Sequence, residues 1–284
     1  MNFELNLKFN IHHSKFNNLR FGGLLDWLYP PRCRFCREST AGWDHDPSTR
    51  APAMAGGHSL RIPPGGLHYF CRRCWEKVRL ATHPLCILCG RPFLDIGGGD
   101  HLCGACISRK PRFARARAWA CYPSDDSDKH PLREVVQRFK YGRKVSLGKP
   151  LGRLMALGCR EAFAGNLPDL LVPVPLHPKR LRWRGFNQSV VLAREVGRIW
   201  NLPMDPMILV RSKETSPQTQ LSEEDRRKNV RDAFVLNPAK SVEGKTILLV
   251  DDIYTSGATV NACSRELLRG GAKEVQVLTL ARTV

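Results

Sequence analysis

One segment near the C-terminus constrains the fold more than any other part of the chain. Residues 246–250 read Thr-Ile-Leu-Leu-Val, a β-branched and leucine run that is typical of a strand buried on both faces of a parallel sheet. Two acids, Asp251 and Asp252, follow this run directly. Small hydroxyl residues and glycine then lead into a helix that we expect over 257–269, where a pair of glycines ends it. A strand, a tight loop and a helix in this order predict one unit of an α/β fold.

Strand and helix patterns also alternate in the chain before this segment. Short apolar runs predict strands, and apolar residues spaced by three and four positions predict amphipathic helices. The expected strands are 117–122, 170–174, 246–250 and 275–280. One helix is expected to begin at Pro131, and three more are expected over roughly 147–163, 188–200 and 257–269. Strands separated by helices favour a parallel sheet with helices on both faces.

The loop after the acid pair has the chemistry of an anion site. It combines the hydroxyls of Thr255, Ser256 and Thr259 with exposed backbone N–H groups and the positive end of a helix dipole. Such a point binds a phosphate monoester. Two carboxylates at the carboxyl edge of the sheet, where ligands of open α/β sheets bind, can accept hydrogen bonds from sugar hydroxyls. The combination selects a ribose 5-phosphate, whereas a dinucleotide groove would need a Gly-x-Gly-x-x-Gly motif that the sequence lacks. An acid pair in an ordinary surface turn is the competing interpretation.

Residues 248–259 resemble the phosphoribosyl pyrophosphate (PRPP) signature of type I phosphoribosyltransferases, in which hydrophobic residues, two acids and a Thr/Ser-Gly-x-Thr loop follow one another. Further blocks are similar to those of the ComF family of competence proteins. These blocks are Phe-Lys-Tyr-Gly at 139–142 and the segments 172–188, 217–222 and 226–231. Together with paired cysteines nearer the N-terminus, and in the same order, the likeness covers nearly everything from Leu24 to Val284.

The resemblance implies roles for individual residues. Asp251 and Asp252 would hold the ribose and oppose the positive charge that builds on it, while Mg²⁺ would bridge pyrophosphate and sugar hydroxyls. The implied ligands of the pyrophosphate leaving group are Arg180, Arg184 and Lys140. The implied PRPP phosphate loop is Thr255, Ser256, Gly257, Ala258 and Thr259.

By position, 173–187 would be a pyrophosphate loop and 212–231 a hood that closes over the substrate. We interpret Trp183 and Phe186 as anchors of the pyrophosphate loop to the core. A solvated basic loop is the competing interpretation of its arginines.

Eight of the eleven cysteines fall into four Cys-x-x-Cys pairs. In a reducing compartment this spacing indicates metal binding, and two pairs can close one tetrahedral zinc site. The candidate ligands are Cys33, Cys36, Cys71, Cys74, Cys86, Cys89, Cys103 and Cys106. Two arrangements fit, sequential ribbons and a cross-braced pair, and a resemblance to double zinc ribbons supports the sequential one. The three remaining cysteines, Cys121, Cys159 and Cys263, are expected to be buried core thiols.

The first ribbon departs from the compact pattern. A Gly-, Pro- and Ser-rich segment, 39–66, is inserted between its two cysteine pairs, and Arg37 stands where a glycine often follows the second cysteine of a pair. We therefore expect three parts: a poorly ordered N-terminal segment (1–23), a double zinc ribbon (24–110) that contains the 39–66 loop, and a phosphoribosyltransferase-like domain (111–284).

Charge and hydropathy bound the setting of the protein. A formal net charge of +19 favours polyanionic partners such as nucleic acid or phosphorylated metabolites. The first residues lack the apolar core of a secretory signal and no run reaches membrane-spanning length, so we expect a cytoplasmic protein without membrane insertion.

The sequence thus favours a PRPP-dependent transferase acting in DNA uptake and natural transformation, with structural Zn²⁺ in the ribbon and Mg²⁺ bound with PRPP. The alternative is a non-catalytic PRPP-sensing or DNA-binding adaptor with the same pocket. Single-stranded DNA and DNA-processing competence proteins are the partners suggested.

The ribbon could be purely structural, or it could present basic residues to DNA; these are Arg32, Arg34, Arg72, Arg73, Lys77 and Arg79. The acceptor and the oligomeric state cannot be read from the sequence.

Overall fold

The computed structural model describes residues 32–33, 35–38, 71–94, 98–123, 130–213, 230 and 232–284. Its centre is a four-stranded parallel sheet in the order β1-β6-β5-β2. The strands are β1 (Arg115–Tyr122), β6 (Glu274–Thr283), β5 (Thr246–Tyr254) and β2 (Leu170–Pro173). A separate antiparallel pair is formed by β3 (Leu209–Arg211) and β4 (Phe234–Leu236). The predicted parallel sheet is confirmed.

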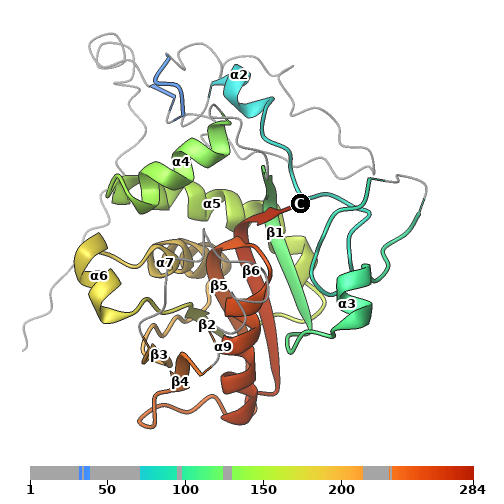
Figure 1. Ribbon diagram of the computed structural model, residues 1–284, viewed down its shortest axis with the longest axis vertical. Helices are drawn as coiled ribbons and strands as arrows, with labels where there is room; N and C mark the ends of the chain where they lie inside the picture. Colours follow the sequence, from blue (N-terminus) through green and yellow to red (C-terminus); the bar gives the residue numbers. More distant parts are fainter. Residues whose placement is uncertain are drawn as a thin grey trace, which may run out of the picture.

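Helices cover both faces of the sheet, as predicted (Figure 1). On one face lie α4 (Pro131–Lys140), α5 (Gly148–Cys159) and α7 (Gln188–Trp200), and on the other lies α9 (Ala258–Arg269). Successive residues of β5 point to opposite faces, so Leu248 and Val250 pack with the first group and Ile247 and Leu249 with α9. Both faces are therefore apolar, which explains the unbroken hydrophobic run in the sequence.

Two element boundaries differ from prediction in ways that matter for the site. β5 continues through the acid pair to Tyr254, because β6 keeps pairing with it as far as Arg282, whereas pairing with β2 stops where Pro173 lies opposite Val250. The helix expected over 147–163 is α5 between two short 3₁₀ turns, Val145–Leu147 and Arg160–Phe163.

The three unpaired cysteines are buried, as predicted: Cys121, Cys159 and Cys263.

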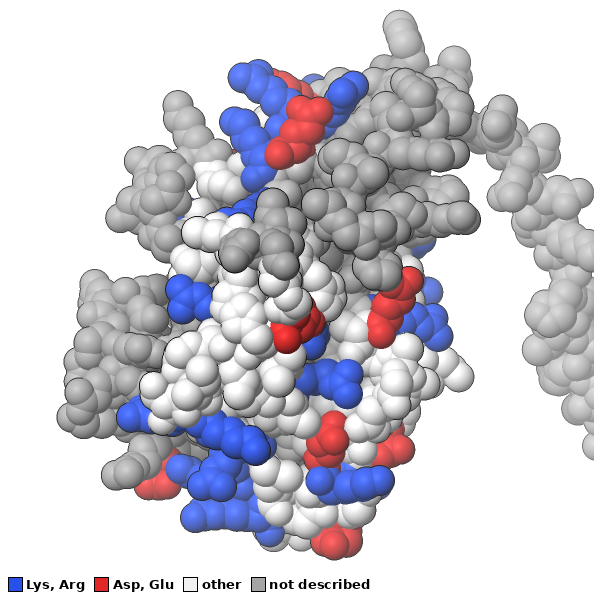
Figure 2. Space-filling view, turned by 90° about the vertical axis from the view of Figure 1, so that its right-hand side faces the viewer, with Lys and Arg blue, Asp and Glu red and all other residues white. Residues whose placement is uncertain are grey.

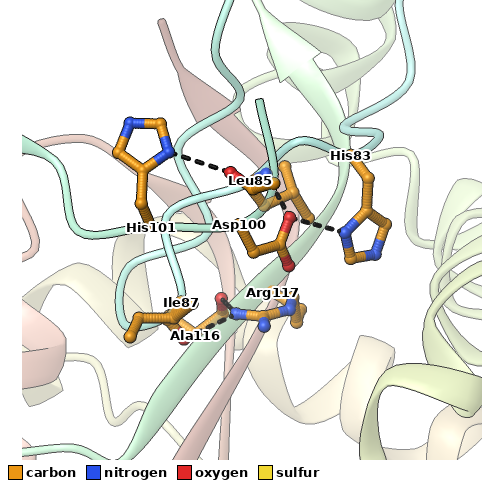
Figure 3. Close-up of polar contacts among 8 residues, drawn as sticks. His83, Leu85, Ile87, Asp100, His101, Ala116 and Arg117 are labelled. Atoms are coloured by element: carbon orange, nitrogen blue, oxygen red, sulfur yellow. Dashed lines mark hydrogen bonds and ion pairs between the residues drawn. The ribbon is translucent and has the colours of Figure 1, made fainter. Parts of the chain in front are cut away.

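The second cysteine ribbon is attached to β1 by a group of polar contacts (Figure 3). An Asp100 carboxylate oxygen accepts from the Leu85 N–H and pairs with the His83 ring, each at 2.8 Å. From β1, Arg117 donates to the backbone carbonyl of Ile87 at 3.2 Å. The Asp100 contacts hold the ribbon together, and the Arg117 contact, with the Ala116 N–H donating to the Leu88 carbonyl at 2.6 Å, joins it to the edge strand of the sheet.

The ribbons use the same tight turn after each first cysteine pair. The Gly90 N–H donates to Cys86 at 2.8 Å and the Arg37 N–H to Cys33 at 2.9 Å, in both cases to the backbone carbonyl. Both turn residues adopt the left-handed conformation, with φ of 67° and 65°. A non-glycine residue in this conformation costs about 1–2 kcal/mol of stability. Arg37, which stands where a glycine is common, therefore adds some backbone strain to the first ribbon.

We predict that Gly90→Ala destabilises the protein by about 2–4 kcal/mol, because a Cβ adds backbone strain and a steric clash. That Cβ would lie 2.4 Å from the Ala116 carbonyl oxygen of β1. The control is Gly104→Ala, where a Cβ meets nothing within 4 Å. Urea unfolding of the two variants measures the difference, and equal stabilities would contradict the docking of this turn on β1.

Candidate functional site

The acid pair lies at the carboxyl edge of the sheet, just beyond the point where β2 ends. Asp251 is 8% exposed and Asp252 is 4% exposed. The Asp251 carboxylate accepts from the Ser189 hydroxyl of α7 at 2.9 Å and from the Asp252 N–H at 2.9 Å. Asp252 in turn accepts from the Ile253 N–H at 2.7 Å. An exposed surface turn, the competing interpretation, is thus excluded by burial.

Lys140, the last residue of α4, pairs with Asp252. Its ammonium nitrogen lies 2.8 Å from a carboxylate oxygen of Asp252. Burial disfavours the charged amine, but the two carboxylates, Asp252 first, outweigh burial and raise the pKa of Lys140. The Phe-Lys-Tyr-Gly block therefore supplies the cation that offsets the acid pair.

Lys140 forms an ion pair with only one of the two adjacent carboxylates, Asp252. Burial, and after it the neighbouring Asp252 carboxylate, raise the pKa of Asp251 to about 7. This site would gain from a further cation or from hydroxyl donors, both of which stabilise ionised carboxylates.

The loop after the acid pair turns sharply into α9. Gly257 has φ of 74° and occupies the N-cap of α9, where no side chain caps the helix from that position. The Ser256 hydroxyl oxygen lies 3.4 Å from the Ala258 N–H that donates to it. Thr255 is exposed, and Ser256, Gly257 and Thr259 are partly exposed. Accessible hydroxyl residues therefore lie at the N-terminus of a twelve-residue helix, where an anion can bind.

The segment expected to be a pyrophosphate loop contains a helix, α6 (Pro178–Arg184). The sequence carried its signals, which the loop interpretation overlooked: a proline in the first turn, His177 as N-cap with its ring accepting from the Lys179 N–H, and Gly185 in the left-handed C-cap position. α6 still carries Arg180, which is partly exposed, and Arg184, which is buried.

Arg184 is oriented by its neighbours. It donates to the Gln188 side chain at 2.6 Å, and its guanidinium carbon lies 5.3 Å from the centre of the Tyr141 ring. Burial lowers the pKa of Arg184, and the nearby Asp252 carboxylate counteracts this. Within the described part of the chain its Nε has no hydrogen-bond partner. Arg184 is thus a buried donor with capacity for an anion beside the acid pair.

The two predicted anchors of this segment differ. Phe186 packs against the core, with its ring centre 5.4 Å from that of Phe139. Trp183 is 56% exposed, so its interpretation as an anchor was wrong. The predicted hood lies almost entirely outside the described residues, of which only Ser212, Lys213 and Val230 belong to it.

Sequence reasoning missed two polar residues near the acid pair. Ser189 bonds directly to Asp251, and its signal was a small hydroxyl residue in the first turn of a predicted helix. Arg211 ends β3 and is 6% exposed. Burial lowers the pKa of Arg211, and repulsion by the Arg180 guanidinium lowers it further. No sequence signal marked Arg211, because β3 itself was not predicted.

The eight paired cysteines form two tetrads. One tetrad is Cys33, Cys36, Cys71 and Cys74, the other is Cys86, Cys89, Cys103 and Cys106, and the sulfurs of each lie within 4.8 Å of one another. Four sulfurs about 2.3 Å from a central Zn²⁺ stand about 3.8 Å apart, so each tetrad fits a structural zinc ion. Of the two arrangements, the structure has the sequential one.

Comparison with protein families finds two matches. Residues 187–283 match the phosphoribosyl transferase domain, which includes the acid pair and its loop. Residues 63–107 match the double zinc ribbon domain.

Full-length relatives extend the match. The chain is 32% identical over 228 residues to Competence protein F of Haemophilus influenzae, covering 79% of this chain and 93% of that protein. It is 34% identical over 218 residues to DNA utilization protein YhgH of Escherichia coli, covering 75% of this chain and 90% of that protein. The chain belongs to the ComF family.

Among solved structures, this ComF-family chain is similar to glutamine PRPP amidotransferase from Bacillus subtilis, with 24% identity and a TM-score of 0.32 over 47% of this chain and 26% of that one. A TM-score this low does not support any inference about function. Within the described ranges, no helix has the length and hydropathy needed to cross a membrane.

Asp251 gives this site a pH dependence. Its pKa is raised to about 7 in the folded protein, against about 4 in an unfolded chain. The stability it contributes is therefore present below about pH 4 and lost as the pH rises toward neutrality. We expect Asp251→Asn to exceed the parent protein in unfolding free energy at pH 8 and to lose that advantage as the pH falls toward 4, measured by urea unfolding.

Asp205 provides a control of opposite sign. Despite partial burial, the Lys240 ammonium at 2.8 Å and the Met207 N–H lower its pKa. Asp205→Asn should therefore reduce stability at neutral pH and lose this effect in acid, below about pH 4. A parent-like pH profile for Asp251→Asn would contradict the buried acid pair.

Proposed function

We propose that this ComF-family protein is a PRPP-binding phosphoribosyltransferase in which an acceptor displaces pyrophosphate from the ribose. The observation that carries the proposal is the buried acid pair followed by the N-terminus of α9, with two arginines on α6. A phosphate, two sugar hydroxyls and a pyrophosphate need these three groups in this order along one edge of a sheet.

The chain's own residues bind and orient the substrate. The loop 255–259 binds the 5-phosphate through backbone N–H groups and hydroxyls. Asp251 and Asp252 accept hydrogen bonds from the ribose hydroxyls and oppose the positive charge that develops on the sugar ring. In the displacement, the acceptor forms a bond to the anomeric carbon as the bond to the pyrophosphate oxygen breaks.

The leaving pyrophosphate requires donors that do not titrate near neutral pH. Arg180 and Arg184 meet this requirement, because guanidinium groups stay charged and match phosphate oxygens in pairs. Lys140 contributes by neutralising Asp252, its partner in the ion pair. Because Arg184 already packs on the Tyr141 ring, it is held in place before substrate arrives.

The donor set of the site fits Mg²⁺, which prefers carboxylate and phosphate oxygens. Asp251 and Asp252 would help to hold Mg²⁺ at this site, where its charge would offset that of the pyrophosphate. Burial and the neighbouring Asp252 carboxylate raise the pKa of Asp251, so a cation at this site would stabilise its ionised form, which supports this assignment. We further propose that the protein acts in the cytoplasm, where reduced thiols persist as zinc ligands, and serves DNA uptake, as the names of its relatives suggest.

Gly257→Ala tests the phosphate loop. A Cβ there would lie 2.2 Å from the Tyr254 hydroxyl and would sit on a residue with positive φ. We expect PRPP affinity in the presence of Mg²⁺ to fall at least tenfold by calorimetry, and pyrophosphate release with a panel of nucleobases and oligonucleotides to fall in parallel.

The matched control is Gly244→Ala, another glycine with positive φ, where a Cβ meets nothing within 4 Å. It carries comparable backbone strain away from the loop. Equal PRPP affinity in the two variants would mean that residues 255–259 do not bind the 5-phosphate.

A second candidate function, a DNA-binding adaptor, is favoured by one surface feature. Tyr141 and Trp183 are both more than half exposed, and their ring centres lie 6.3 Å apart. Arg143 donates to the Trp183 carbonyl at 2.6 Å, and Lys144 and Arg182 are exposed nearby in the sequence. Exposed aromatic rings among cations provide stacking surfaces for single-stranded nucleic acid.

The face that carries α3 (Gly104–Ser108) and β1 offers less to DNA. Its Lys and Arg side chains lie in separate groups with Asp and Glu among them (Figure 2). On the first ribbon, Arg72 is paired with Glu76 at 2.8 Å. This supports a structural role for the ribbons, so we assign the nucleic-acid surface of the adaptor hypothesis to Tyr141 and Trp183.

We predict that Trp183→Ala weakens binding of a fluorescent oligothymidine about fivefold, equivalent to about 1 kcal/mol for one lost stacking contact. PRPP affinity should stay unchanged. Replacing Arg73 and Lys77 by Ala is the comparison variant, and a larger loss there than at Trp183 would move the surface to the ribbon.

A further inference from the structure

Two buried residues connect the second cysteine tetrad with the phosphate loop. Tyr254 on β5 and Arg282 on β6 lie opposite each other in the sheet and are 8% and 5% exposed. The Arg282 guanidinium donates to the backbone carbonyl of Cys89, a member of the tetrad. Its carbon lies 4.8 Å from the centre of the Tyr254 ring. One guanidinium thus contacts the ribbon and the sheet at once.

Tyr254 contacts the loop from below. A Cβ built at Gly257 would lie 2.2 Å from the Tyr254 hydroxyl oxygen, so the tyrosine fills the space beneath the loop. The next residue, Ala258, is buried in the same apolar cluster as the four cysteines of the second tetrad. Phe113 joins this cluster and meets the Tyr254 ring edge-on at 6.2 Å. The contacts are therefore continuous from the ribbon to the loop.

Arg282 has an electrostatic reason to lie there. Burying a guanidinium without a compensating charge is costly, and within the described ranges no carboxylate pairs with Arg282. Four cysteine thiolates around one Zn²⁺ carry a net charge of about minus two. The metal-bound tetrad therefore supplies the negative charge that holds Arg282, and through it Tyr254, in place.

We propose that Arg282 and Tyr254 are positioning residues that brace the phosphate loop against the second zinc ribbon. On this basis the ribbon is part of the ligand-binding machinery, and zinc at the second tetrad sets how well the loop is formed. The proposal rests on the proposed function in one respect, that the loop binds the 5-phosphate.

The experiment uses the full chain with two substitutions and one control. Arg282→Lys keeps the charge but cannot contact the Cys89 carbonyl and the tyrosine ring together, and Tyr254→Phe removes only the hydroxyl beneath Gly257. Arg115→Lys is the control, since Arg115 also lies on a strand of the sheet and donates to a backbone carbonyl, that of Ala162 at 2.7 Å. Zinc content, hydrogen exchange of residues 255–259 and affinities for ribose 5-phosphate and pyrophosphate are measured for each.

We expect both variants to retain two zinc ions per chain. Exchange at 255–259 should accelerate, and ribose 5-phosphate affinity should fall five- to tenfold, while pyrophosphate affinity stays within twofold of the parent, because pyrophosphate is assigned to the α6 arginines. The control should resemble the parent in every measurement. A general loss of folding would instead weaken both ligands together.

Unchanged exchange and unchanged ribose 5-phosphate affinity in both variants would overturn the brace. An equal loss of both ligands would also overturn it, since the residues would then support the fold and not the loop. If the parent protein binds neither ligand, the proposed function fails, and the exchange data alone decide whether the brace exists.

Discussion

The account of this protein depends on two adjacent buried carboxylates, of which only Asp252 forms an ion pair with Lys140. Burial and mutual repulsion raise the pKa of Asp251, and Lys140 reaches from α4 to Asp252. A purely structural role would favour apolar residues here, because an incompletely balanced pair is unfavourable in a core. A ligand with hydroxyl donors and an associated cation, as we propose, would satisfy the site. In that proposal the α6 arginines and the loop before α9 bind the two phosphate ends of the ligand.

The zinc ribbons lie against opposite faces of the structure that carries the site. The first tetrad packs in the cluster that contains α4, and Arg138 of α4 donates to the Phe35 carbonyl of that ribbon at 3.2 Å. The second tetrad packs in the cluster that contains the start of α9. One ribbon thus packs with the helix that carries Lys140, and the other packs with the start of α9, which follows the proposed phosphate loop. This arrangement explains why a small metal-bound module stays attached to a domain that has its own core.

Much of this could be predicted from the sequence, because the signals were local. The buried strand before Asp251, the helix from Gln188 to Trp200 and the paired cysteines all follow from short-range patterns, and the family resemblance added the order of the blocks. What could not be predicted depends on long-range contacts: Lys140 meets Asp252 across more than a hundred residues, and Arg282 meets Cys89 across the sheet edge. Helix α6 was missed for another reason, since the loop expected from the resemblance outweighed its capping signals.

A crystal structure of the full chain grown with PRPP and Mn²⁺, with anomalous data for zinc and manganese, tests the central claim most directly. The account predicts zinc in both cysteine tetrads and the 5-phosphate against the backbone of 255–259. It also predicts that the ribose hydroxyls donate hydrogen bonds to Asp251 and Asp252, with manganese between these hydroxyls and the pyrophosphate. PRPP bound away from the acid pair, or crystals that exclude it at saturating concentration, would contradict the assignment of this edge of the sheet as the substrate site.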